Sequence, residues 1–75
     1  MKLAQRLTAI IEREDEGFVA LCPDLDIASE GASIEEARVN LIEALTLFFE
    51  TAAPSEVARR FHSEVFVTQV EVPVG

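Results

Sequence analysis

The sequence predicts an α+β fold: a four-stranded, mainly antiparallel sheet with a layer of helices on one face. Three observations predict it. Two β-branched apolar segments flank an acidic turn, a capped amphipathic helix begins after Ser33, and residues 62–72 alternate in hydropathy. The expected order is β-β-β-α-(α)-β, a two-layer sandwich. The 75 residues leave room for one domain, spanning 1–75.

The first two strands form a predicted hairpin. Residues 3–13 make the first strand, because the segment 7–11 is apolar and β-branched. Residues 14–17 form the turn, and Gly17 is expected to take the positive φ on which a short hairpin loop ends. The second strand covers 18–22.

The second strand also predicts a partner chain. It ends at Pro23, which has no N–H to donate to a ladder, and a third strand follows before Gly31. Residues 18–22 are apolar on both faces, whereas a strand with one wet face alternates more cleanly. We therefore expect a second copy to cover the second face of the sheet, which predicts a homodimer or tetramer.

The helix start is the most specific local signal. Ser33 and Glu36 form a capping box, in which the Ser33 hydroxyl accepts from the Glu36 amide and the Glu36 carboxylate accepts from the Ser33 amide. Pro54 ends this helix and opens a second one over 55–61, before the last strand at 62–72. The apolar stripe of the long helix is Ile34, Ala37, Leu41, Ala44, Leu45, Phe48 and Ala52.

The charge of the chain is acidic and local. Fourteen acids and six bases give −8 at pH 7, and the whole excess belongs to residues 12–36. This balance argues against unaided binding to nucleic acid, whose phosphates repel it. A single cysteine, no apolar leader and no stretch of ~20 apolar residues predict a cytoplasmic protein without a membrane span.

Two candidate reactive groups have plainer explanations. Cys22 and His62 are the only thiol and imidazole, but a free cysteine usually packs as a small hydrophobe. Asp24, Asp26 and Glu30 lack the spacing of a calcium loop, and they suit a solvated acidic turn better than a pair of Mg²⁺ ligands. The sequence therefore predicts no catalytic residue, metal or cofactor, and no enzyme.

The acidic segment has two interpretations. It is either a solvated surface that keeps the protein soluble, or a recognition surface that speeds and selects association with a basic partner. Charge clustering alone chooses the candidates for that contact, which are Glu14, Asp15, Asp24, Asp26 and Glu30.

The chain carries an ordered set of motifs: the run from Glu16 to Leu25 with its Cys-Pro turn, the run from Ser29 to Ala37, and the pairs Asn40-Leu41 and Glu43-Ala44. This ordered set resembles the HicB family of antitoxins. The resemblance covers about residues 7–49. It implies a reduced ribonuclease-H-like fold and a protein that neutralises a small, basic, mRNA-cleaving toxin of the HicA type. An acidic chain suits this role because its carboxylates stand where the toxin binds phosphates.

The expected function is therefore antitoxin-like binding of such a toxin. Many HicB proteins continue into a C-terminal DNA-binding domain, but here the chain stops at Gly75, after the last strand, so direct operator binding is not expected. Two alternatives stay open: an orphan homo-oligomeric binding or structural module, and a vestigial metal-dependent nuclease. The nuclease is disfavoured because the first strand carries its carboxylate, Glu12, near its end and not at its middle.

Overall fold

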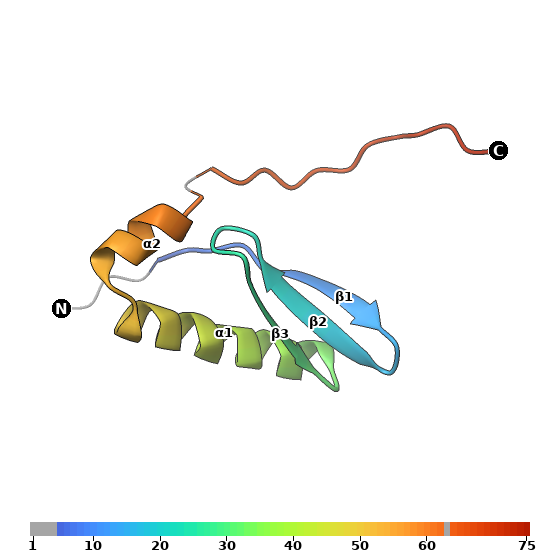
Figure 1. Cartoon of the computed structure of the whole chain (residues 1–75). Helices are drawn as coiled ribbons and strands as arrows, with labels where there is room; N and C mark the ends of the chain where they lie inside the picture. Colours follow the sequence, from blue (N-terminus) through green and yellow to red (C-terminus); the bar gives the residue numbers. More distant parts are fainter. Residues whose placement is uncertain (1–4, 63) are drawn as a thin grey trace.

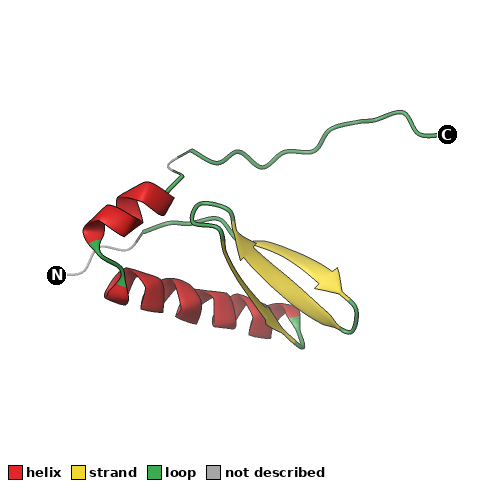
Figure 2. Cartoon of the chain, in the orientation of Figure 1, coloured by secondary structure: helices red, strands yellow, loops and turns green. Residues whose placement is uncertain are grey.

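The structure is a computed structural model that describes residues 5–62 and 64–75. This part of the chain contains three strands and two helices (Figure 1 and Figure 2). The predicted α+β class is confirmed. Neither described helix is both long and apolar enough to cross a membrane. The elements are β1 (Ile10–Glu14), β2 (Gly17–Cys22), β3 (Ile27–Gly31), α1 (Ile34–Thr51) and α2 (Pro54–Arg60).

The three strands form one antiparallel sheet in the order β1-β2-β3, and its first hairpin turn differs from the prediction. Asp15, and not Gly17, has the positive φ, at 54°. Aspartate tolerates this conformation because its short side chain can bond to nearby backbone. Gly17 is required for space instead, since a Cβ there would lie 2.9 Å from the carbonyl oxygen of Gly31.

β1 is shorter than the predicted strand 3–13. Residues 5–9 form no strand, and residues 3 and 4 lie outside the described part of the chain. β2 ends just before a proline, so the segment ahead of β1 has no ladder to extend. The amide of Thr8 donates instead to Oδ1 of Asp24, at 3.0 Å.

α1 packs on one face of the sheet, closest to β3 (Figure 1). Gly31 permits this approach, because a Cβ there would lie 2.5 Å from the Ala37 amide nitrogen and 2.8 Å from the carbonyl carbon of Glu36. The buried core consists of Ala20 and Cys22 from β2, Leu25 from the turn between β2 and β3, and two residues of the predicted stripe of α1, Ala37 and Leu41.

The opposite face of the sheet is not covered by any described element. Leu21 points to this face and is 36% exposed, while Val19 is half-buried. The register places Ile10 and Ala28 on either side of Leu21, so these apolar side chains share the open face. The idea that a second copy covers them stays a prediction.

The capping box is confirmed with one change. The amide of Glu36 donates to the Ser33 hydroxyl at 3.0 Å, as predicted. The Glu36 carboxylate accepts from the amide of Ala32 at 2.8 Å, one residue earlier than expected. The helix ends at Thr51, ahead of Pro54, as predicted.

The C-terminal part of the chain agrees only in part with the prediction. α2 begins at Pro54 and ends at Arg60, within one residue of the predicted helix at each end. The fourth strand predicted over 62–72 is not confirmed: residues 64–75 are extended, join no ladder and lead away from the sheet, while residue 63 lies outside the described part (Figure 1). Alternating hydropathy suits a strand, but a strand also needs a neighbour for its backbone hydrogen bonds.

Candidate functional site: an acidic surface at the hairpin end

A group of carboxylates surrounds a shallow hollow at the hairpin end of the sheet. The hollow has a volume of about 510 Å³. The β1–β2 turn, the end of β3 and the first turn of α1 supply five acidic residues, and its lining includes no lysine or arginine. These residues, which we call the acidic surface, are Glu14, Asp15, Glu16, Glu30 and Glu36.

The antiparallel ladder brings these acids together. Glu14 lies opposite Gly17, and Phe18 lies opposite Gly31, so the end of β1, the start of β2 and the end of β3 meet at one end of the sheet. The close approach of α1 at Gly31 then adds Glu36. Carboxylates far apart in the chain therefore share one surface because the strands alternate in direction.

Two contacts hold the frame of the acidic surface. The Asn40 side-chain amide donates to the carbonyl oxygen of Glu30 at 2.8 Å, which ties β3 to α1. The guanidinium of Arg13 lies 4.6 Å from the centre of the Phe18 ring, a cation–π contact on the helix side of the sheet. The carboxylates themselves stay open to solvent, apart from the capping bond of Glu36. At physiological salt, charges interact over about 8 Å, so this surface acts on a partner mainly at short range.

Three of the five predicted contact residues lie on the acidic surface, and two do not. Glu14, Asp15 and Glu30 line the hollow. Asp24 and Asp26 occupy the turn between β2 and β3, at the other end of the sheet. The predicted set therefore divides between two ends of the molecule.

Asp24 has an internal partner set. The residue is only 8% exposed, and its Oδ1 accepts from the amide of Thr8 and from the Cys22 thiol, at 3.0 and 3.5 Å. Asp26, in contrast, is exposed, has a φ of 57° and pairs with His62 at 3.4 Å. Asp24 therefore stabilises the fold, and only Asp26 is available at this end.

Cys22 and His62 have separate partners and do not form a catalytic pair. The thiol of Cys22 donates to Asp24, while the ring of His62 contacts Asp26. Burial, together with the hydrogen bond to Asp24, raises the pKa of the Cys22 thiol. The sulfur is therefore held as a thiol, whereas a nucleophile must be a thiolate.

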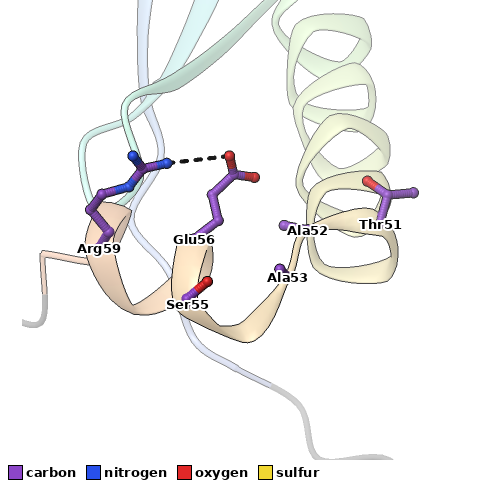
Figure 3. A pocket seen from close by; sticks show the side chains of 6 residues that line it. All are labelled: Thr51, Ala52, Ala53, Ser55, Glu56 and Arg59. Carbon is purple, nitrogen blue, oxygen red and sulfur yellow. Dashed lines mark hydrogen bonds and ion pairs between the residues drawn. The ribbon is translucent and has the colours of Figure 1, made fainter.

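A second hollow, of about 460 Å³, lies between the end of α1 and α2 (Figure 3). Glu56 and Arg59, which both belong to α2 and line this hollow, point toward one another, with 3.4 Å between the paired atoms (Figure 3). The pair cancels its own charge, so this hollow offers a ligand less than the acidic surface does. Within residues 5–62 and 64–75, no three acidic, histidine or cysteine side chains are grouped as metal ligands. The residues that line this second hollow are Thr51, Ala52, Ala53, Ser55, Glu56 and Arg59.

Sequence reasoning missed two members of the acidic surface. Glu16 was a residue of the hairpin turn, and Glu36 was assigned to the helix cap alone. The spacing of Ser33 and Glu36 is a signal for the cap, but only the packing of α1 against β3 shows that Glu36 also faces the hairpin. The sequence pattern therefore predicts Glu36 as a helix-cap residue, and the tertiary structure also places it in the lining of the hollow beside the hairpin turn.

Comparisons with known proteins identify no relative: no family model, curated protein or solved structure matches this chain. The resemblance to HicB antitoxins therefore depends on the ordered motifs within residues 7–49.

Proposed function

We propose that this protein is an antitoxin-like binding protein that neutralises a small, basic, mRNA-cleaving toxin of the HicA type. One observation carries the proposal: five carboxylates line a single hollow at the hairpin end, with no basic residue among them. A toxin that binds RNA presents a basic surface, and carboxylates can occupy the places of phosphates on it. The motifs that resemble the HicB family support the same function.

In this proposal the contact is made by the acidic surface. Glu14, Asp15 and Glu30 remain from the predicted set, and Glu16 and Glu36 join them because they line the same hollow. Asp24 and Asp26 would act at the other end, where Asp24 supports the fold and Asp26 is a minor contact at most. The toxin–antitoxin pair would form in the cytoplasm, without direct contact to operator DNA.

The proposal includes a finer description of the fold. We propose a reduced ribonuclease-H-like arrangement, in which the segment 64–72 becomes the fourth strand once its backbone is paired. Its alternating hydropathy supports this assignment.

A binding experiment tests the function. A gene beside this one should encode a small basic protein whose toxicity is relieved by co-expression. Titration calorimetry would then compare Glu14→Lys/Glu30→Lys with Glu43→Lys/Glu50→Lys, which makes the same change of charge on exposed positions of α1. The first variant should weaken binding by about tenfold or more, because close charge pairs at an interface contribute on the order of 1.5 kcal/mol or more. The difference between the two variants should become smaller at high salt, which screens exposed charges. Equal weakening by both variants would show that only net charge matters and would contradict the proposal.

A second candidate function is a homo-oligomeric module without a toxin partner. The exposed apolar side chains of the open sheet face and of the C-terminal segment favour it. It predicts self-association and no binding of any small basic protein, so the same titration separates the two functions.

A further inference from the structure

The C-terminal segment 64–74, which we call the tail, is rich in β-branched residues, and from Phe66 onward most of its apolar residues share one side. Phe66, Thr68, Val70, Val72 and Val74 lie on the even-numbered side, whereas Gln69 and Glu71 lie on the odd-numbered side together with Val65, Val67 and Pro73. The even-numbered apolar residues are 67–91% exposed. An extended segment with this pattern and this exposure lacks both a ladder partner and a surface to cover its apolar side.

The sheet has one free edge that suits such a strand. β1 pairs only with β2, so the backbone groups along its outer edge have no ladder partner in the described chain. The outer edge of β3 is different: α1 lies against this strand, and the Asn40 side chain occupies the carbonyl of Glu30. Unpaired edges readily accept another strand, and β1 is therefore the edge available to the tail.

Several contacts fix the point where the tail leaves the domain. The amide of His62 donates to the Asp24 carbonyl at 2.7 Å, and the Arg60 guanidinium donates to the Leu25 carbonyl at 3.0 Å. From this junction the chain runs outward, beyond the sheet and helices, along the longest dimension of the molecule (Figure 1). The direction of exit carries the tail away from its own sheet (Figure 1).

The position of α1 adds a reason for a second copy. α1 lies under β3 and β2 and has little contact with β1. A fourth strand placed on β1 of its own chain would have no helix beneath it, so its apolar side would stay in water. Reciprocal exchange brings two β1 edges and two tails together, and each copy then supplies cover for the other.

We infer that this protein forms a twofold homodimer in which the tail of each copy adds as a strand to the outer edge of β1 in the other copy. The inference does not depend on the acidic surface, which lies at the turn and not along this edge. It adds to the proposed fourth strand one further statement, namely that the other copy of the chain supplies this strand.

The first test measures the oligomeric state of the full chain. Sedimentation equilibrium should show a dimer whose dissociation is raised by Val70→Asp, which puts a charge on the apolar side of the tail. Gln69→Asp introduces the same residue one position earlier, on the opposite side, and is the matched control. We expect the dissociation constant to rise by about tenfold or more for Val70→Asp and by less than about threefold for Gln69→Asp. A monomer at all concentrations, or equal effects of the two variants, would overturn the inference.

The second test separates exchange between chains from folding of the tail onto its own sheet. In a Cys22→Ala background, one population carries Gln69→Cys and a second, tagged population carries Glu12→Cys. A short bismaleimide should link the two populations, with circular dichroism confirming that each variant is folded. A chain carrying both cysteines that links only within itself, or no link between populations, would overturn the exchange.

Discussion

The backbone amide of His62 lies 2.7 Å from the carbonyl oxygen of Asp24 and donates a hydrogen bond to it. The Asp24 side chain accepts at the same time from the amide of Thr8. One residue of the β2–β3 turn therefore connects the chain that leads into β1 with the chain that leaves α2. This junction closes one end of the domain, and the acidic surface lies at the other end.

Replacing Asp24 should destabilise the domain. Asp24→Ala leaves the Thr8 amide without its acceptor in a partly buried position, which costs about 1–3 kcal/mol. Asp26→Asn is the control, because the exposed asparagine tolerates the positive φ and should change the free energy of unfolding by less than about 0.5 kcal/mol. Urea denaturation measures both, and a similar loss for the two variants would mean that the Asp24 junction is not structural.

Adding a methyl group at Gly31 should cost more than adding one at Gly17. The Cβ of Gly31→Ala meets two backbone atoms of α1 at 2.5 and 2.8 Å, so the helix must move away from β3. The Cβ of Gly17→Ala meets a single backbone atom within 3.0 Å, the carbonyl oxygen of Gly31 at 2.9 Å, so it has fewer and longer close contacts to relieve. We expect a loss of about 1–3 kcal/mol or more for Gly31→Ala and a smaller loss for Gly17→Ala, from urea midpoints. The reverse order would show that α1 is free to shift at this contact.

Removing the helix cap should lower stability without changing the fold. Ser33→Ala deletes the acceptor for the Glu36 amide, which typically costs about 1 kcal/mol. Glu35→Gln removes an exposed ion pair with Arg38 and one negative charge from the first turn of α1, and it should stay within about 0.5 kcal/mol. Thermal unfolding followed by circular dichroism compares them, and an effect of Glu35→Gln as large as that of Ser33→Ala would assign the stability to charge rather than to the cap.

Stability should fall at alkaline pH because of Cys22. Burial raises the pKa of this thiol in the folded chain, so above the ordinary thiol pKa of about 8.5 the unfolded chain loses its proton first. The folded state then binds more protons than the unfolded state, and the free energy of unfolding decreases as pH rises from that point; below it the thiol contributes no pH dependence. Urea denaturation from pH 7 to 10 should show a steeper decline for the natural chain than for Cys22→Ala. Parallel declines would assign the alkaline loss to other groups.

Local signals in the sequence were enough to predict most of the elements. A proline after Cys22, a serine and a glutamate at the spacing of a capping box, and a proline after Ala53 each act within a few residues of themselves. The end of β2, the start and end of α1, and the start of α2 follow from such short-range chemistry, namely missing N–H groups and a side chain that satisfies a free amide. The predicted α+β class rests on these elements.

The roles of individual acids depended on packing between distant segments. In the sequence Asp24 and Glu30 are similar acidic residues, but packing buries the first against the Thr8 amide and leaves the second exposed beside the hairpin turn. The tail shows the same limit, because its alternation predicts a strand without saying which edge pairs with it. Burial, close approach and strand pairing arise between residues far apart in the chain, and local patterns carry no information about those distances.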